Sequence, residues 1–230
     1  MMINLCIINA SPRGKNNSRS DFIINNIIKL LSNEVKVTKY YSGDIINKPN
    51  LFEEIIKNDV LLFASPLYAD SIPSSALRFL YSFDDFLAKK EKKINLKVYG
   101  LINCGFLEGT QNKIALQILE NFCVQTKLNW CFGVGIGAGE ALPELGQINS
   151  PKGLNSKIYK ALSSLVSSIQ SNNNVSHNSN IFVNPLIPKY MYILAAHHGW
   201  KLQAKNKFKL KSKDLYKKIY TNYPISPNKF

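Results

Sequence analysis

Short apolar runs that alternate with helical patterns are the feature that most constrains how this chain can fold. The first run, Ile3–Ile8, leads into a polar loop, and apolar residues then recur at helical spacing from Phe22 to Leu31. A later run, Val60–Ala64, is continuously apolar, which is typical of a strand buried on both faces of a parallel sheet. This alternation predicts a doubly wound α/β domain with helices on both faces of the sheet.

The same signals predict five strands and the domain organisation of the 230 residues. The other strands are expected at Val35–Tyr40, Leu96–Cys104 and Leu128–Ile136, and helices at 51–57, from about 73, at 110–126 and at 156–169. An Asn- and Ser-rich stretch follows and is typical of a linker. We therefore predict an α/β domain at 1–170, a linker at 171–180 and a helical, Lys-rich extension at 181–230.

The charge of the chain is uneven, and most of it lies in this extension. The net charge is +14, and residues 181–230 hold ten Lys against one acidic residue, Asp214, which gives 10 − 1 = +9. Apolar residues there recur on one side of an expected helix: Ile187, Tyr190, Met191, Leu194, His198 and Leu202. The main domain lacks a strong basic excess, so we expect no nucleic-acid partner.

Cysteine and histidine usage gives no support for a metal or iron–sulfur centre. The four cysteines contain no Cys-x-x-Cys pair, and the three histidines lack zinc-ligand spacing. We expect buried, reduced thiols. No apolar stretch reaches the length of a membrane span, and the N-terminal run has neither a basic leader nor a cleavage site, so we expect a cytoplasmic protein without a signal peptide.

The loop after the first strand, Ser11–Ser18, is rich in hydroxyl, amide and cationic groups. Backbone N–H groups at the start of the following helix favour an anion, the hydroxyls of Ser11 and Ser18 could complete a phosphate cradle, and Arg13 would neutralise its charge. The alternative is an ordinary loop in which Ser18 only caps the helix. We predict phosphate binding here.

Two further loops extend this pattern to later strand ends. Ser65-Pro66-Leu67-Tyr68 follows the third strand, and Asn103-Cys104-Gly105-Phe106-Leu107-Glu108 follows the fourth. Together with Ser-Pro-Arg after the first strand, these motifs resemble NAD(P)H-dependent FMN reductases of the flavodoxin-like superfamily. The resemblance implies a flavodoxin-like strand order, in which the ligand lies where the first and third strands diverge.

The resemblance also implies how FMN would be held. Its phosphate would contact Ser11, Arg13, Asn17 and Ser18, while the isoalloxazine would lie between Pro66, Leu67, Tyr68 and Ala69 on one edge and Asn103, Cys104, Gly105 and Phe106 on the other. A flavin needs a flat apolar wall, which Tyr68 can supply, and close backbone approach, which Gly105 permits. No catalytic side chain is named, because the flavin carries the chemistry.

By this resemblance the chain is expected to be an oxidoreductase that passes a hydride from NAD(P)H through FMN to a quinone, a nitroaromatic or free flavin, as a homodimer. Two alternatives stay open. A flavodoxin-type electron carrier would share the fold, although such carriers are typically acidic. A non-catalytic flavin- or anion-binding module could use the basic tail to dock on anionic lipid or nucleic acid.

Glycines from Gly133 to Gly139 suggest a dinucleotide fingerprint at first sight. They form Gly-x-Gly-x-Gly rather than Gly-x-Gly-x-x-Gly, and they belong to the fifth strand rather than the first. We interpret them as the end of that strand and its loop.

Overall fold

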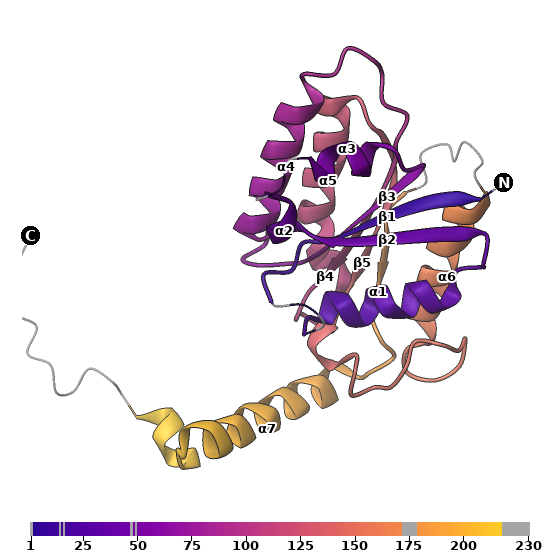
Figure 1. Cartoon of the computed structure of the whole chain (residues 1–230). Coiled ribbons are helices and arrows are strands. Elements are labelled where there is room, and N and C mark those ends of the chain that lie inside the picture. Colours follow the sequence, from indigo (N-terminus) through magenta and orange to yellow (C-terminus); the bar gives the residue numbers. More distant parts are fainter. Residues whose placement is uncertain are drawn as a thin grey trace, which may run out of the picture. The chain divides into compact units, whose positions relative to one another are not determined.

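The computed structural model describes residues 2–13, 15, 17–46, 48, 50–171 and 179–217, and the chain divides into two units, Met1–Leu186 and Ile187–Phe230. The first unit is built on one sheet whose strands all run parallel (Figure 1). The strands are β1 Ile3–Asn9, β2 Val35–Tyr41, β3 Val60–Pro66, β4 Lys97–Asn103, β5 Asn129–Ile136 and β6 Ile181–Val183. Their order in the sheet is β2-β1-β3-β4-β5-β6.

This architecture confirms the predicted flavodoxin-like, doubly wound fold, with six strands in place of five. The additional strand, β6, pairs with β5 from Val134–Ile181 to Ile136–Val183. The sequence analysis places these residues in the extension, because a run of three apolar residues is too short to predict a strand. Residues 172–178 of the predicted linker lie outside the described residues.

Helices cover both faces of the sheet (Figure 1). One face packs against α1 Arg19–Leu30 and α6 Ser156–Ser171, and the other against α2 Ser42–Ile46, α3 Leu51–Ile56, α4 Ser74–Leu87 and α5 Lys113–Thr126. Successive strand residues point to opposite faces, so Leu5 and Ile7 join the first core while Cys6 and Ile8 join the second. The sheet is therefore buried on both sides, as its continuous apolar runs predicted.

The strand order places a switch point between β1 and β3. The chain leaves β1 through α1 toward β2, whereas after β3 it moves to the opposite side of the sheet through α4 and β4. In open parallel sheets the loops at the carboxyl ends of the two diverging strands leave a crevice that binds ligands. The three predicted binding loops follow β1, β3 and β4, so they meet at this edge.

The glycines of β5 serve close packing, in agreement with our interpretation of them as strand and strand-end residues. A Cβ atom on Gly133 would lie 2.3 Å from a methyl carbon of Leu116 on α5. A Cβ on Gly137 would meet backbone atoms, at 2.0 Å from the carbonyl oxygen of Leu107 and 2.7 Å from the nitrogen of Gly109. The loop after β4 therefore depends on the bare backbone of Gly137.

The second unit consists of α7 Lys189–Phe208 and η3 Ser212–Tyr216. The predicted helix is present, but its apolar residues are exposed rather than gathered on one buried side: Tyr190, Met191, Leu194 and Leu202 are all exposed. Within α7 the side chain of Ala204 is buried, and the Ala204 carbonyl accepts a hydrogen bond from the N–H of Leu210. Among the described residues no helix is long and apolar enough to cross a membrane.

We predict that Gly137→Ala lowers the free energy of unfolding by about 2–3 kcal/mol, because the added methyl group meets backbone that has no rotamer with which to yield. Gly43→Ala is the matched control, since nothing lies within 4 Å of a Cβ at that position. Urea denaturation of both variants measures the difference. Equal stability of the two variants would contradict the packing role of Gly137.

Candidate functional site

Helix α1 begins at the switch point, and Ser18 caps it. The Ser18 hydroxyl accepts a hydrogen bond from the backbone N–H of Asp21 at 3.0 Å and donates one to the Asp21 carboxylate at 2.9 Å. The side-chain amide of Asn9, at the end of β1, also donates to this hydroxyl at 3.4 Å. The capping role of Ser18 is thus observed, and its hydroxyl is already engaged within the protein.

The Asp21 carboxylate ties α1 to strand β2. Its side chain is 2% exposed, and its oxygen Oδ1 accepts hydrogen bonds from Lys39 Nζ at 2.5 Å and the Tyr41 hydroxyl at 3.0 Å. Burial would raise the pKa of Asp21, but the hydrogen bonds from Lys39, Ser18 and Tyr41 outweigh it and hold this pKa below its ordinary value. The ionised carboxylate therefore fixes the position of the helix N-terminus.

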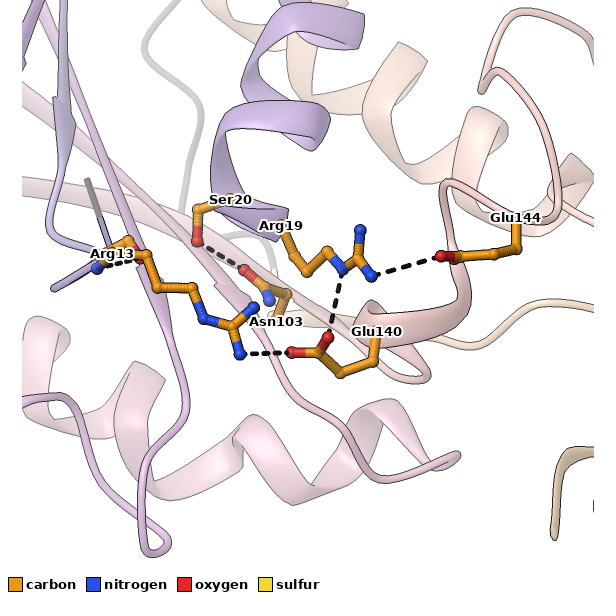
Figure 2. Close-up of polar contacts among 7 residues, drawn as sticks. Arg13, Arg19, Ser20, Asn103, Glu140 and Glu144 are labelled. Atoms are coloured by element: carbon orange, nitrogen blue, oxygen red, sulfur yellow. Dashed lines mark hydrogen bonds and ion pairs between the residues drawn. The ribbon is translucent and has the colours of Figure 1, made fainter. Parts of the chain in front are cut away.

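Two arginines and two glutamates face one another beside this helix start (Figure 2). Arg13 Nη2 lies 3.3 Å from Glu140 Oε1, and Arg19 Nε lies 3.2 Å from Glu140 Oε2. Arg19 Nη2 also lies 3.3 Å from Glu144 Oε1. Glu140 belongs to η2 Gly139–Ala141, directly after β5. No local sequence pattern predicts these ion pairs, because the arginines and the glutamates are more than 120 residues apart in the sequence.

Near Ser11 the first loop is stabilised by hydrogen bonds between residues that are two apart in the sequence. The N–H of Ser11 donates to the Asn9 side-chain oxygen at 3.0 Å, and the N–H of Arg13 donates to the Ser11 hydroxyl at 3.3 Å. Arg13 and Asn17 are exposed, and Ser11 is half-buried. The loop thus keeps its amide and guanidinium groups at the surface, next to the start of α1.

The loop after β3 forms a tight turn. The N–H and C=O groups of Tyr68 and Ser71 exchange two hydrogen bonds, of 2.8 and 3.0 Å, and the two residues between them, Ala69 and Asp70, have φ values of +46° and +61°. Positive φ at both central positions is the signature of a type I′ turn. The turn presents Tyr68, 43% exposed, to solvent, whereas the Leu67 side chain is buried in the core.

The loop after β4 packs against the loops on either side of it. The carbonyl of Asn103 accepts a hydrogen bond from the N–H of Leu67 at 2.8 Å, and the carbonyl of Cys104 accepts one from the N–H of Gly139 at 2.7 Å. The Asn103 side-chain oxygen accepts a bond of 2.8 Å from the Ser20 hydroxyl on α1 (Figure 2). The loops after β3 and β4, the start of α1 and the segment after β5 are therefore joined at one edge of the sheet.

Within this loop the side chains divide between core and surface. Cys104 is 2% exposed, and burial raises the pKa of its thiol. Gly105 and Phe106 are exposed, and a Cβ on Gly105 would meet only the Glu140 side chain, at 3.8 Å. The side chains of Cys104 and Leu67 are thus part of the core and not of the exposed surface of the site.

The residues at this edge fit the group that the sequence predicted. The first turn of a helix leaves N–H groups without intrahelical partners, and here Ser18 occupies the one from Asp21. The N–H groups of Arg19 and Ser20 could hold a phosphate, together with the Arg13 guanidinium once it leaves the Glu140 carboxylate 3.3 Å away. Tyr68 and Phe106, which is 54% exposed, provide aromatic surface in the two neighbouring loops. Such a set of donors and aromatic groups could hold an anionic group next to a flat ring.

A hollow lies at the opposite edge of the sheet, and its lining does not match this donor set. Its volume is about 520 Å³, and it lies between the C-terminal ends of α4 and α5, with Lys90, Lys92, Lys93 and Lys127 in its wall. The amino ends of parallel strands meet there, and ligands of open α/β sheets bind at the carboxyl ends. The charged wall also lacks the exposed aromatic residues of the first site.

No group of three or more His, Cys, Asp or Glu side chains that could hold a metal ion occurs in the part of the chain that the structure describes. The four cysteines are free and buried.

Among the comparisons with known proteins, the one with solved structures supports the fold. No protein-family model and no curated protein sequence matches this chain. An oxidoreductase from Corynebacterium diphtheriae is similar in structure, with a TM-score of 0.54 and 15% identity over 74% of this chain and 96% of that one. The apo form of an NADH:FMN oxidoreductase has a TM-score of 0.55 and 11% identity over 77% and 92%. The chain thus shares the flavodoxin-like fold of these oxidoreductases.

We predict that Asp21→Asn destabilises the protein by about 2–4 kcal/mol at neutral pH, because Lys39 loses its buried counterion. Since the folded-state pKa of Asp21 is lowered, its contribution is present above the ordinary carboxyl pKa and is lost as pH falls through the folded value. The gap between wild type and variant should therefore narrow in acid.

Urea denaturation at neutral and acidic pH measures that gap. Asp44→Asn is the control, because Asp44 pairs with Lys15 at the surface and its removal should change stability by at most about 1 kcal/mol. A gap between wild type and Asp21→Asn that is the same at both pH values would contradict the role given to the ionised carboxylate.

Proposed function

We propose that this protein is an FMN-dependent oxidoreductase that transfers a hydride from NAD(P)H to a small acceptor such as a quinone, a nitroaromatic or free flavin. The observation that carries the proposal is the meeting of three loops at the switch point, one cationic and two with exposed aromatic residues. The names of the similar structures, an oxidoreductase and an NADH:FMN oxidoreductase, support the same class.

Each loop has a distinct task in this proposal. Arg13, Ser11 and Asn17, with the first-turn N–H groups of α1, bind the phosphate. The turn at Tyr68 and Ala69, after Pro66 and Leu67, borders one edge of the ring, and Asn103 to Phe106 border the other. The contribution of Ser18 is to cap α1 and so to orient its N–H groups, because its hydroxyl already bonds to Asp21.

Bound FMN would supply the hydride chemistry, while the protein would bind, orient and shield it. Gly105 is exposed and has no side chain, so its backbone does not block the approach of a nicotinamide and later of an acceptor. The Cys104 thiol takes no part, because it is buried and its raised pKa keeps it protonated.

We propose further that the protein acts as a homodimer in the cytosol. Helices α4 and α5 expose Tyr81 at 73% and Val124 at 72%, and Leu77 and Phe122 line a groove of about 260 Å³ between the helices. Apolar surface of this kind supports association between two copies. Four free cysteines support a reducing compartment.

The direct test is spectroscopic. Purified protein incubated with FMN and freed of excess ligand should keep the flavin absorbance, and anaerobic NADH or NADPH should bleach it without a partner reductase. Bound flavin that neither nucleotide bleaches would favour an electron carrier. Absence of flavin binding would contradict the proposal altogether.

We predict that Arg13→Ala weakens FMN binding by about 10- to 100-fold, because a charge-assisted contact to phosphate is lost. Riboflavin, which lacks the phosphate, should bind with unchanged affinity. Quenching of flavin fluorescence measures both constants. Lys15→Ala removes the same charge from the same loop, but Lys15 pairs with Asp44 at 2.8 Å, so its effect should stay below about threefold.

A further inference from the structure

We infer that Glu140 is an internal competitor for the phosphate site: its carboxylate occupies the guanidinium groups of Arg13 and Arg19 until a flavin phosphate displaces it from Arg13. The inference rests on the proposed function and adds a regulatory element to the same site. It makes FMN binding an exchange of one anion for another.

The geometry of the cluster carries this inference. Glu140 uses both carboxylate oxygens, Oε1 toward Arg13 at 3.3 Å and Oε2 toward Arg19 at 3.2 Å (Figure 2). A carboxylate placed between two guanidinium groups occupies the position that a phosphate would seek, since both anions accept the same charge-assisted hydrogen bonds. Arg13 is thus turned toward the protein's own acid.

The charges of the cluster also support competition between Glu140 and a phosphate. Two guanidinium groups face the carboxylates of Glu140 and Glu144, so this part of the site has no net charge. A phosphate monoester carries between one and two negative charges at neutral pH. It would meet repulsion from Glu140 as well as attraction from Arg13, and the cluster would bind it less tightly than two unpaired arginines.

The position of Glu140 is set by the fold rather than by the ion pairs. It follows β5 in η2, where Gly139 donates its N–H to the Cys104 carbonyl at 2.7 Å and Ala138 donates its N–H to the Phe106 carbonyl at 2.5 Å. Its side chain lies next to Gly105. When Arg13 turns to a phosphate, Glu140 keeps Arg19 as a partner, so the displaced carboxylate is not left unpaired.

The exposure of the Arg13 and Glu140 side chains determines how strongly the two residues interact. The Arg13 and Glu140 side chains are 49% and 54% exposed, so their pairing is a weak, salt-sensitive interaction that a ligand can break. The cofactor would then exchange with free flavin instead of being held permanently. Such exchange suits a protein for which free flavin is also an acceptor.

The test measures FMN and riboflavin affinities of Glu140→Gln by flavin fluorescence at low and high salt. We expect FMN to bind about 3- to 30-fold tighter than to wild type at low salt, with the gain shrinking at about 1 M salt and with riboflavin binding unchanged. When Arg13 is already replaced by Ala, Glu140→Gln should improve FMN affinity less: the logarithm of the gain should be under half of its value in the presence of Arg13.

Glu144→Gln is the matched control, since it removes the same charge from the same loop but, among the residues that the structure describes, pairs with Arg19 and not with Arg13. An equal gain in FMN affinity from Glu144→Gln would show that only the net charge matters, and it would overturn the inference. Weaker or unchanged FMN binding by Glu140→Gln would also overturn it. If wild type and every variant bind neither flavin, the proposed function itself fails. Wild-type binding of FMN without a gain in Glu140→Gln refutes only the competitor role.

Discussion

The buried contact between Asp21 and Lys39 decides where helix α1 begins, and the candidate site depends on that position. Asp21 bonds at the same time to the cap of its own helix, Ser18, and to strand β2 through Lys39 and Tyr41. Because a buried carboxylate without these partners would be costly, the chain has one way to place the first turn of α1. The N–H groups of that turn consequently point to the switch point between β1 and β3.

The loops after β3 and β4 are connected to the start of α1 by hydrogen bonds. Ser20, the second residue of α1, donates a hydrogen bond to Asn103 at the end of β4, and the Asn103 carbonyl accepts one from the N–H of Leu67 after β3. The glycines of β5 then allow the loop after β4 to lie against its neighbour without a Cβ between them. Backbone hydrogen bonds thus connect the strand ends at this edge, where Arg13, Tyr68 and Phe106 have exposed side chains.

The sequence was sufficient to predict the layers of the fold and the loops that meet, because apolar runs and helical spacing are local signals. The sequence also indicates the burial of Cys104, because Cys104 lies two residues after Ile102 and successive strand residues alternate between the two faces of the sheet. Both side chains belong to the same core. The strand β6 was missed because three residues make too weak a pattern. The pairing of Arg19 with Glu140 spans 121 residues of sequence, and no local spacing reveals such a contact.

A crystal structure of the protein with FMN tests the central claim most directly. The account predicts that the phosphate lies at the N-terminus of α1 within hydrogen-bond distance of Arg13, and that the isoalloxazine lies between the loops of Tyr68 and Phe106. A flavin bound instead at the opposite edge, among Lys90, Lys92 and Lys93, would contradict it, as would a phosphate that Arg13 does not contact.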